Sequence, residues 1–339
     1  MEQPGPDDGT LETLADGLVL LRTPPQGQDA GARGPVEGSA TWSWTPPATL
    51  PGLSADARRV DVFYTPHPDD ETLSMGVLIA AATSRGDRVI VVCLTDGRTS
   101  GAIRDINARL AADHDAPALT ADDLGQARDG ELRRATGALG VHPDDVVLAH
   151  LDAPGSDGGA IVTVAEAEQV VRFFAARYPG ATHTTMSDVA ERQQDHLDAG
   201  VALHRLLDAH VVTSAQWTVS RLWWSLPGPR WTWALPSTPA ERESVRRAGI
   251  EYQTWDPRDR EFAVGFYSVR WQFAALGRDV RDRVHGTGPT SSGILATVPM
   301  TPTRAARAVT RTRVTARVTA GTAGTRSGRR ARRTGRTTG

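Results

Sequence analysis

The 339-residue chain lacks several features that define particular classes of protein. Cys93 is its single cysteine, which excludes a disulfide framework within the chain. It lies in an apolar run and is predicted to be a small buried side chain. No stretch reaches the ~18 apolar residues of a membrane span. The N-terminus, MEQPGPDDGT, has no basic segment followed by an apolar one, so no signal peptide is visible and a cytoplasmic protein is expected.

Lysine is also absent, and arginine supplies all 38 basic residues. The last 39 residues hold 11 arginines and no acidic residue, whereas the first 300 hold 27 arginines and 40 acidic residues, a net charge of −13. A basic tail can bind nucleic acid or an anionic surface. This tail has no aromatic residues between its arginines and no nucleic-acid-binding signature, which favours a solvated extension instead.

Composition divides the chain into three regions. Residues 1–58 are rich in Pro, Gly and Asp, which predicts an irregular N-terminal extension with a short edge strand around residues 42–44. Residues 59–290 carry the apolar periodicity of a folded domain, and their C-terminal part, 217–290, is rich in tryptophan. Residues 291–339 have no such period, which predicts a disordered basic tail.

Predicted strands and helices alternate within the central region. Apolar runs predict strands over residues 59–65, 88–95, 145–151, 181–186 and 217–224. Helices are predicted over residues 71–85, 122–139, 162–178, 195–209, 239–248 and 267–284. This alternation predicts an α/β protein with a Rossmann-like, three-layer α/β/α fold and a mostly parallel sheet. The connection over residues 98–120 is long for a compact domain and is predicted to cover a substrate.

A candidate metal site follows the first predicted strand. His67-Pro68-Asp69-Asp70-Glu71 lies between that strand and a helix, at the sheet edge where α/β proteins bind ligands. A hydrolytic zinc site needs three protein ligands and an open position for water. His67 and Asp70 can supply two ligands, and His196, after a later strand, is the best candidate for the third. Asp69 can then accept a proton from the water and return it to a leaving amine.

The tetrapeptide His-Pro-Asp-Asp occurs twice, and the second copy is a control on this interpretation. His142-Pro143-Asp144-Asp145 follows a predicted helix and precedes a predicted strand. It is therefore expected at the opposite edge of the sheet, where Pro-Asp-Asp is typical of a turn. The context of strand before and helix after favours a metal site for the first copy alone.

Several elements together resemble the PIG-L/LmbE-like superfamily of zinc-dependent N-acetylglucosaminyl deacetylases. They span roughly residues 58–210 and comprise the strand-HPDDE-helix element at 63–71, Thr95-Asp96-Gly97, Arg128-Asp129-Gly130-Glu131-Leu132 and Asp195-His196. The resemblance implies a Rossmann-like fold. It also implies hydrolysis of an N-acetyl group from an amino sugar or glycoconjugate, with release of acetate.

The resemblance further implies roles for individual residues. A His₂Asp site also accepts iron or cobalt, so the choice of zinc is an expectation from the family. The expected partner is a small amino sugar or glycoconjugate, and the sequence does not indicate an oligomeric state. The metal would be held by His67, Asp70 and His196. Asp69 would be the general base and acid. The substrate would be contacted by Arg128, Asp157 and Ser74.

One departure from the family pattern bears on activity. Many relatives carry His-Pro-Asp-His at the third ligand, where the first histidine helps to stabilise the oxyanion. Here Gln193 takes that position, and its neutral amide gives weaker electrostatic stabilisation unless another group, such as His150, contributes. Both are candidate catalytic residues. The departure keeps two alternatives open: a zinc amidohydrolase acting on a non-sugar amide or thiol conjugate, and a catalytically impaired protein that holds metal and binds a ligand.

Other residues have structural as well as functional interpretations. Arg128 is either a surface residue of its helix or a sugar contact, and Asp96 either supports the site or sets a turn. His183 lies within a buried strand and is predicted to be a core histidine. Most tryptophans are predicted to pack internally, whereas Trp231 and Trp233 are expected at a pocket rim.

Overall fold

The computed structural model describes residues 10–13, 19–22, 44–46, 59–114, 116–150, 162–191, 193–225, 231–286 and 295–296. By their contacts, residues 1–297 form one unit and residues 298–339 another. The second unit lies outside the described ranges, as does most of the predicted basic tail. Within the described ranges, no helix combines the length and the apolarity needed to cross a membrane.

A sheet of eight strands, in the order β12-β8-β11-β7-β6-β3-β4-β5, forms the centre of the described fold. Three short strands extend it by antiparallel pairing: β11 (Asp282–Gly286), β8 (Thr232–Ala234) and β12 (Leu295–Ala296). The other five are parallel: β5 (Val146–Leu148), β4 (Arg88–Cys93), β3 (Val60–Thr65), β6 (Thr182–Met186) and β7 (Ala215–Val219). The predicted α/β fold with a mostly parallel sheet is confirmed.

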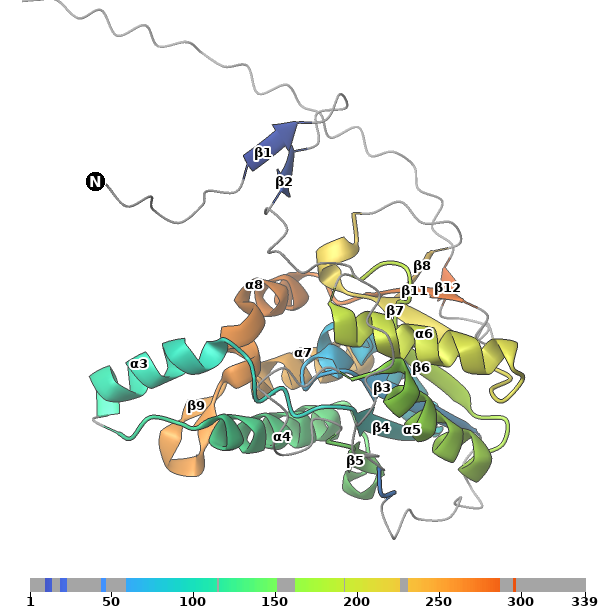
Figure 1. The fold of residues 1–339 in the computed structure, drawn as a ribbon, viewed down its shortest axis with the longest axis horizontal. Coiled ribbons are helices and arrows are strands. Elements are labelled where there is room, and N and C mark those ends of the chain that lie inside the picture. The colour runs from blue at the N-terminus through green and yellow to red at the C-terminus, as the bar shows by residue number, and fades with distance from the viewer. Residues whose placement is uncertain are drawn as a thin grey trace, which may run out of the picture. The chain divides into compact units, whose positions relative to one another are not determined.

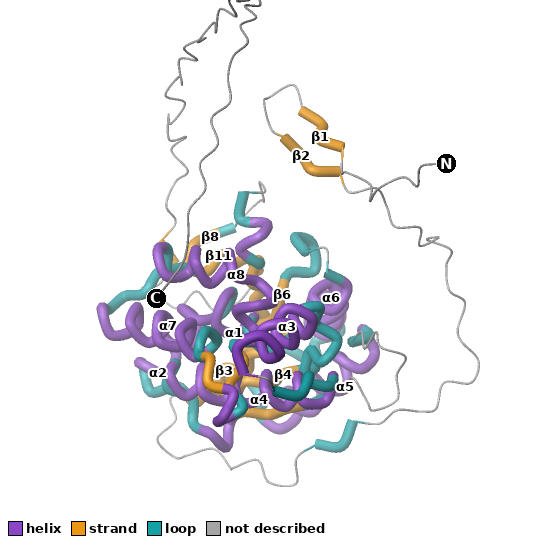
Figure 2. Tube along the Cα trace, turned by 90° about the vertical axis from the view of Figure 1, so that its left-hand side faces the viewer, coloured by secondary structure: helices purple, strands orange, loops and turns teal. Residues whose placement is uncertain are grey.

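Helices cover both faces of this sheet, which makes the three layers that the sequence predicts (Figure 1). One face carries α5 (Val164–Arg177) and α6 (Gln194–Asp208), which pack against each other. The opposite face carries α2 (Gly76–Ser84), α4 (Ala121–Ala138), α7 (Pro239–Glu251) and α8 (Val264–Arg278). Figure 2 shows β3 and β4 lying among these helices.

Alternation along the central strands builds a separate core on each face. Val62 of β3 and Ile90 of β4 pack towards α5 and α6, whereas Phe63 and Val91 pack towards the other helices. All four side chains are buried. Burial on both faces is typical of parallel strands and explains why their sequences are nearly continuous apolar runs. Each such side chain contributes about 1.5–3 kcal/mol relative to an exposed position.

Threonine side chains define where three helices begin. Thr120, Thr163 and Thr238 precede α4, α5 and α7, and each accepts a hydrogen bond from the backbone N–H three residues later. The acidic side chain at that third position accepts a bond back from the threonine N–H, which completes a capping box. Each cap contributes about 1 kcal/mol, and the three helices begin close to their predicted starts at residues 122, 162 and 239.

The predicted helix over residues 71–85 is in fact two helices. α1 (Asp70–Leu73) ends before α2, and the N–H groups of Val77 and Leu78 donate to the Asp282 carboxylate at 2.8 and 3.1 Å. Asp282 lies on β11, 205 residues after Val77, and burial raises its pKa to about 7. Because this cap comes from so far along the chain, the local sequence could not indicate the break.

Smaller elements complete the described structure. The connection over residues 98–120, predicted as a loop, contains α3 (Ala102–His114). Its Ile106 and Leu110 pack against Leu124 and Phe262, so a short apolar stripe that is weak by itself becomes helical through packing. The remaining elements are β1 (Thr10–Thr13) paired with β2 (Val19–Arg22), β9 (Trp255–Asp256) paired with β10 (Glu261–Phe262), and the 3₁₀ turns η1 (Pro143–Asp145), η2 (Arg221–Trp223) and η3 (Pro257–Asp259).

Three further predictions of secondary structure are corrected. The predicted helix over residues 267–284 ends as α8 at Arg278, because the residues beyond Arg281 pair with β7 and β8 as β11. The predicted strand over residues 217–224 ends at Val219, and Ser220 then caps η2. Of the edge strand predicted around residues 42–44, the structure describes Trp44, which is not in a strand but packs edge-on against Phe173, with ring centroids 5.2 Å apart.

Candidate metal centre

The order of the parallel strands reverses between β3 and β6. β4 and β5 follow on one side of β3, and β7 follows on the far side of β6. In open α/β sheets, ligands bind outside the carboxyl ends of the strands at this switch point. The segment after β3 carries His67, Asp69 and Asp70, and the segment after β6 leads to His196 in the first turn of α6. The topology thereby brings together two histidines that are 129 residues apart.

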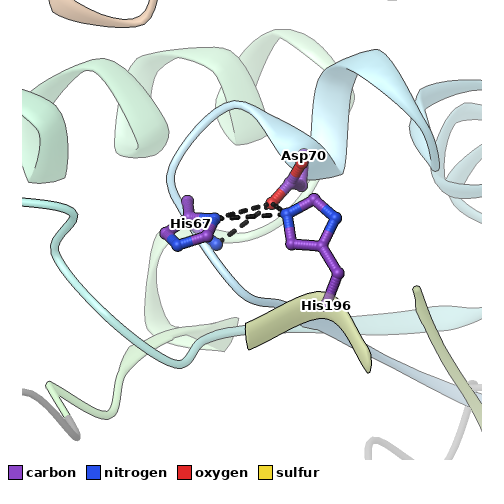
Figure 3. A group of neighbouring side chains, drawn as sticks. All are labelled: His67, Asp70 and His196. Atoms are coloured by element: carbon purple, nitrogen blue, oxygen red, sulfur yellow. Dashed lines mark hydrogen bonds and ion pairs between the residues drawn. The ribbon is translucent and has the colours of Figure 1, made fainter. Parts of the chain in front are cut away.

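His67, Asp70 and His196 point toward one another at this edge (Figure 3). Asp70 Oδ2 lies 3.4 Å from His67 Nδ1 and 3.2 Å from His196 Nε2, and the two nitrogens are 3.3 Å apart. Three ligand atoms bound tetrahedrally at ~2.0–2.1 Å from one zinc ion would lie about 3.3 Å from one another. The three atoms fit one face of such a tetrahedron. Among the described residues they are the one His/Cys/Asp/Glu group close enough to share an ion.

A carboxylate faces the remaining nitrogen of each histidine. His67 Nε2 lies 2.8 Å from Asp195 Oδ2, and His196 Nδ1 lies 3.4 Å from Glu191 Oε2. Asp195 and Glu191 in turn accept hydrogen bonds from backbone N–H groups, at 3.1 and 2.7 Å. Partners of this kind orient metal-binding histidines and fix their tautomers.

Neighbouring carboxylates affect the charge of both histidines: Asp195 and Asp70 act on His67, and Asp70 and Glu191 act on His196. Burial lowers the pKa of His67 and of His196, but the surrounding carboxylates outweigh burial and raise both pKa values above their ordinary range. Burial raises the pKa of Asp70, and the two histidines outweigh it, so that the pKa lies well below its usual range. A cluster that favours positive charge at this point also suits a cation bound there.

Asp69 stands beside the triad in a strained backbone conformation. Its φ of 121° lies in the left-handed region, which non-glycine residues rarely adopt. Its backbone N–H donates to Glu71 Oε2 at 3.0 Å, and its carboxylate pairs with Arg128 Nη2 at 3.0 Å. Burial raises the pKa of Asp69 to about 8, against the opposing effect of Arg128. The surrounding contacts therefore hold Asp69 in a conformation that it would not adopt alone.

Arg128 is a buried residue, so its interpretation as a surface residue of α4 is wrong. It is 4% exposed and donates to the carbonyl oxygens of Pro68 and Gly97 at 2.5 and 3.2 Å, in addition to its ion pair with Asp69. The guanidinium therefore ties together the segments that follow β3 and β4. Gly97 has a φ of 61°, and a Cβ there would lie 2.3 Å from an Arg128 nitrogen, so the Thr-Asp-Gly turn needs its glycine.

Glu71 and Tyr252 form a second support for Asp69. The Tyr252 hydroxyl donates to Glu71 Oε1 at 2.8 Å, and the other oxygen of Glu71 accepts from the Asp69 N–H. Glu71 and Tyr252 are fully buried, and burial raises the pKa of Glu71 to about 7. Tyr252 lies at the C-terminal end of α7, so a distant helix contributes to the position of Asp69.

The candidate metal ligands, Asp69 and Arg128 line a cavity of about 440 Å³, within the ~300–1,000 Å³ range of small-molecule sites. Of the predicted site residues, the lining includes His67, Asp69, Asp70, Arg128, Gln193 and His196. The Gln193 amide nitrogen lies 3.5 Å from His67 Nε2. Thr99 and Ser100 also line the cavity, so part of the connection that the sequence assigned to substrate covering does reach it.

Two of the predicted site residues that the structure describes do not line the cavity. His150 pairs with an Asp129 carboxylate oxygen at 3.0 Å and is not among the residues that line the cavity. Ser74 is 1% exposed and does not line the cavity either, because its place at the end of α1 buries it. Asp157 lies outside the described residues.

The tryptophan prediction is also corrected. Trp231 and Trp233 do not line the cavity; they flank and form β8, where Arg283 and Arg281 lie over their rings at 4.3 and 4.0 Å. The tryptophans that line it are two others, Trp223 of η2 and Trp271 of α8.

Other predictions agree with the structure. Cys93 is fully buried, and His183 is a core histidine whose Nδ1 lies 2.9 Å from the buried Tyr64 hydroxyl. Asp96 accepts a hydrogen bond from the Arg98 backbone N–H at 2.9 Å, which supports its role in the turn.

Sequence reasoning missed some residues of the site. Glu191 precedes His196 by five residues, and an acidic residue so near a candidate ligand histidine is a signal that could have been used. Tyr252 and Trp271 had no local signal, because their positions at the site depend on the packing of α7 and α8.

Comparison with known proteins identifies relatives of the central region of the chain. Residues 62–207 match the PIG-L family, described as GlcNAc-PI de-N-acetylase. A 1D-myo-inositol 2-acetamido-2-deoxy-alpha-D-glucopyranoside deacetylase of Mycolicibacterium gilvum is 34% identical over 177 residues, which are 49% of this chain and 58% of the relative. The deacetylase of the same name from Mycobacterium tuberculosis H37Rv is 50% identical over 80 residues, 24% of each chain. The chain thus spans less than two thirds of the length of these relatives.

Solved structures similar to this one include a deacetylase of the teicoplanin biosynthetic pathway. It has 17% sequence identity and a TM-score of 0.45, and the match covers 69% of this chain and all of that one. An N,N'-diacetylchitobiose deacetylase from Pyrococcus horikoshii has 16% identity and a TM-score of 0.41, over 70% of this chain and 88% of that one. Similarity at this level says nothing about activity. The sequence match is therefore one of similarity: residues 62–207 of this chain resemble the PIG-L family.

Proposed function

We propose that this protein is a zinc-dependent hydrolase that removes the acetyl group from an N-acetylated amino sugar or glycoconjugate and releases acetate. The observation that carries the proposal is the triangle of His67, Asp70 and His196, with Asp69 beside it in a cavity of substrate size. The names of the matching relatives supply the class of substrate. We further propose residues 59–290 as the catalytic domain.

The donor set fits a zinc ion, because its three atoms have the spacing of tetrahedral ligands. A bound zinc ion would supply a water of lowered pKa and would polarise the acetyl carbonyl. Asp69 accepts the proton that this water loses on attacking the carbonyl carbon, and it gives the proton to the amine nitrogen when the C–N bond breaks. Water and amide are thereby converted to acetate and a free amine.

The other polar side chains position this chemistry. Arg128 holds the Asp69 carboxylate, and Asp195 and Glu191 hold the two histidines. Gln193 lines the cavity next to His67, where its amide N–H can donate to the acetyl oxygen as negative charge develops on it. A neutral donor contributes less there than a charged histidine would, so we expect a modest turnover rate.

A second candidate function is that of a protein that binds metal and ligand without efficient turnover. The presence of glutamine at position 193 favours it. A zinc amidohydrolase acting on a non-sugar amide or a thiol conjugate is the other alternative. Both share the site with the main proposal: the binding protein would release little or no product, and the amidohydrolase would release a different one.

The test combines metal analysis with acetate release from N-acetylglucosamine derivatives, for the wild type, for Asp69→Ala and for Asp144→Ala. Asp144 is the matched aspartate of the second His-Pro-Asp-Asp copy, and its side chain is 68% exposed. We expect stoichiometric zinc in all three proteins, and acetate from the wild type and Asp144→Ala but at least ~10³-fold less from Asp69→Ala. Zinc without acetate from any sugar would favour the alternatives, and a wild type without stoichiometric metal would contradict the proposal.

A further inference from the structure

One part of the cavity lining is uncharged and partly apolar. It consists of the residues contributed by η2, α8 and the position before η2: Ser220, Leu222, Trp223, Ser268, Val269, Trp271 and Gln272. None of these side chains ionises. Leu222 is 52% exposed and Trp271 49% exposed, and they are two of the five large apolar side chains that the described part of the chain leaves in solvent. An apolar surface left exposed at the mouth of a site is typical of a ligand contact.

The backbone of α8 is distorted beside these uncharged residues, which we call the wall of the cavity. Val269 interrupts α8 with φ −143° and ψ 50°, and the residue before it, Ser268, meets Ser100 at 2.8 Å between hydroxyl oxygens. Trp271 follows that interruption and lines the cavity, whereas its neighbour Arg270 lies over the ring of Tyr267 and 3.7 Å from an aspartate. The charge next to Trp271 is thus engaged away from the wall.

The rest of the described lining does not favour an anionic ligand. Its acidic residues are Asp69, Asp70, Glu191 and Asp195, whereas its one arginine, Arg128, is already paired with Asp69. A bound divalent ion would offset two negative charges and still leave no excess of positive charge. Recognition of a phosphate group depends on arginine or lysine side chains aimed at it, and the described lining offers none that is not already paired.

From these two observations we infer that the substrate is an electrically neutral N-acetyl amino sugar that carries a flat apolar aglycone, which contacts Leu222 and Trp271, and that sugars bearing phosphate are poor substrates. This inference rests on the proposed function. The aromatic ring of Trp271 and the branched side chain of Leu222 can cover one face of an aryl group, and burial of that contact stabilises the complex.

The test compares three substrates with the zinc-loaded protein: phenyl and methyl N-acetyl-β-glucosaminide and N-acetylglucosamine 1-phosphate. We expect kcat/KM for the phenyl glycoside to exceed that for the methyl glycoside about tenfold, and the phosphate to react more slowly than the methyl glycoside. Trp271→Ala and Leu222→Ala should each remove most of the preference for phenyl, and Trp271→Phe should retain part of it. Ile250→Ala, at another exposed apolar residue that does not line the cavity, should change nothing.

Equal kcat/KM for the phenyl and methyl glycosides, or a preference that survives Trp271→Ala, would overturn the inference. Calorimetric binding to zinc-loaded Asp69→Asn separates it from the proposed function, because binding needs no turnover. If the wild type released no acetate from any sugar, the proposed function would fail. If zinc-loaded Asp69→Asn bound the phenyl glycoside more tightly than the methyl glycoside, and Trp271→Ala removed that difference, the inferred contact with the aglycone would still be supported. Equal binding of the two glycosides would refute it.

Discussion

The two copies of His-Pro-Asp-Asp differ in everything except their sequence. The first follows β3, at the carboxyl edge of the parallel strands, and the second precedes β5, at the amino edge. In the first copy, Asp70 Oδ2 lies 3.4 Å from His67 Nδ1 and 3.2 Å from His196 Nε2. In the second, Asp145 pairs with Arg88 at 2.6 Å. The comparison teaches that the side of the sheet, and not the tetrapeptide, decides which of them can hold a metal.

The backbone and the next residue differ as well. Asp69 has a φ of 121°, whereas its counterpart Asp144 lies within the 3₁₀ turn η1. Glu71 follows the first copy and accepts a hydrogen bond from the Asp69 N–H, but Val146 follows the second and begins β5. A strained aspartate thus occurs only in the copy that has a glutamate to hold it.

The largest expected effect is the loss of metal from the first copy alone. We expect His67→Ala to lose stoichiometric zinc and to lower acetate release at least ~10³-fold, because it removes one of three ligands. His142→Ala should retain zinc and activity, since its side chain is 68% exposed and caps a short turn. Metal analysis and kcat/KM for the two variants check this, and equal losses would break the comparison.

The second copy should matter for stability instead. Asp145 accepts hydrogen bonds from Arg88 at 2.6 and 3.1 Å, and both side chains are at most 10% exposed. We expect Asp145→Ala to lower the free energy of unfolding by about 2–3 kcal/mol with kcat/KM unchanged, because it leaves Arg88 without this partner. Urea denaturation measures the loss. A double variant with Arg88→Ala should lose less than the sum of the single variants.

Carboxylate partners also distinguish His67 and His196 from His183, whose Nδ1 lies 2.9 Å from the Tyr64 hydroxyl. Burial lowers the pKa of His183 to about 4, below its value of 6.5 in an unfolded chain. The unfolded state therefore takes up the proton first, and folding stability is lost as the pH falls through this range. We expect His183 to account for about 2 kcal/mol of the stability lost between pH 7.5 and pH 5.

The measurement is urea denaturation at the two pH values for the wild type and His183→Asn. Asparagine places an acceptor oxygen near the position of Nδ1, where the Tyr64 hydroxyl can donate to it. The variant should show a smaller loss between the two pH values. An unchanged pH dependence would mean that His183 does not titrate in this way.

The smallest effect tests the support of Asp69. We expect Tyr252→Phe to lower kcat about tenfold with zinc content and KM unchanged, because the hydroxyl steadies Glu71, which positions Asp69. Tyr267→Phe is the matched control, since that hydroxyl bonds to Arg109 outside the cavity. If both variants behaved alike, Tyr252 would have a structural role only.

Local patterns were enough for much of the fold and for the ligand candidates. The strands β3, β4 and β6 and the helices α4, α5 and α6 begin and end within a few residues of their predicted bounds, because continuous apolar runs, threonine caps and flanking glycines act within a few residues. The order of strand and helix around His67 also indicated the correct edge of the sheet, and hence the turn role of the second copy.

Tertiary structure alone decided the rest. The sequence could not show that Asp282 caps α2, that Tyr252 supports Glu71, or that Trp271 rather than Trp233 lines the cavity. Each of these depends on a contact between residues far apart in the chain, and the chain's local periodicity carries no information about which distant side chain will be nearby. The sequence by itself determined which residues could bind a metal and carry a proton, whereas packing of the C-terminal helices determined what steadies them and what surface a substrate meets.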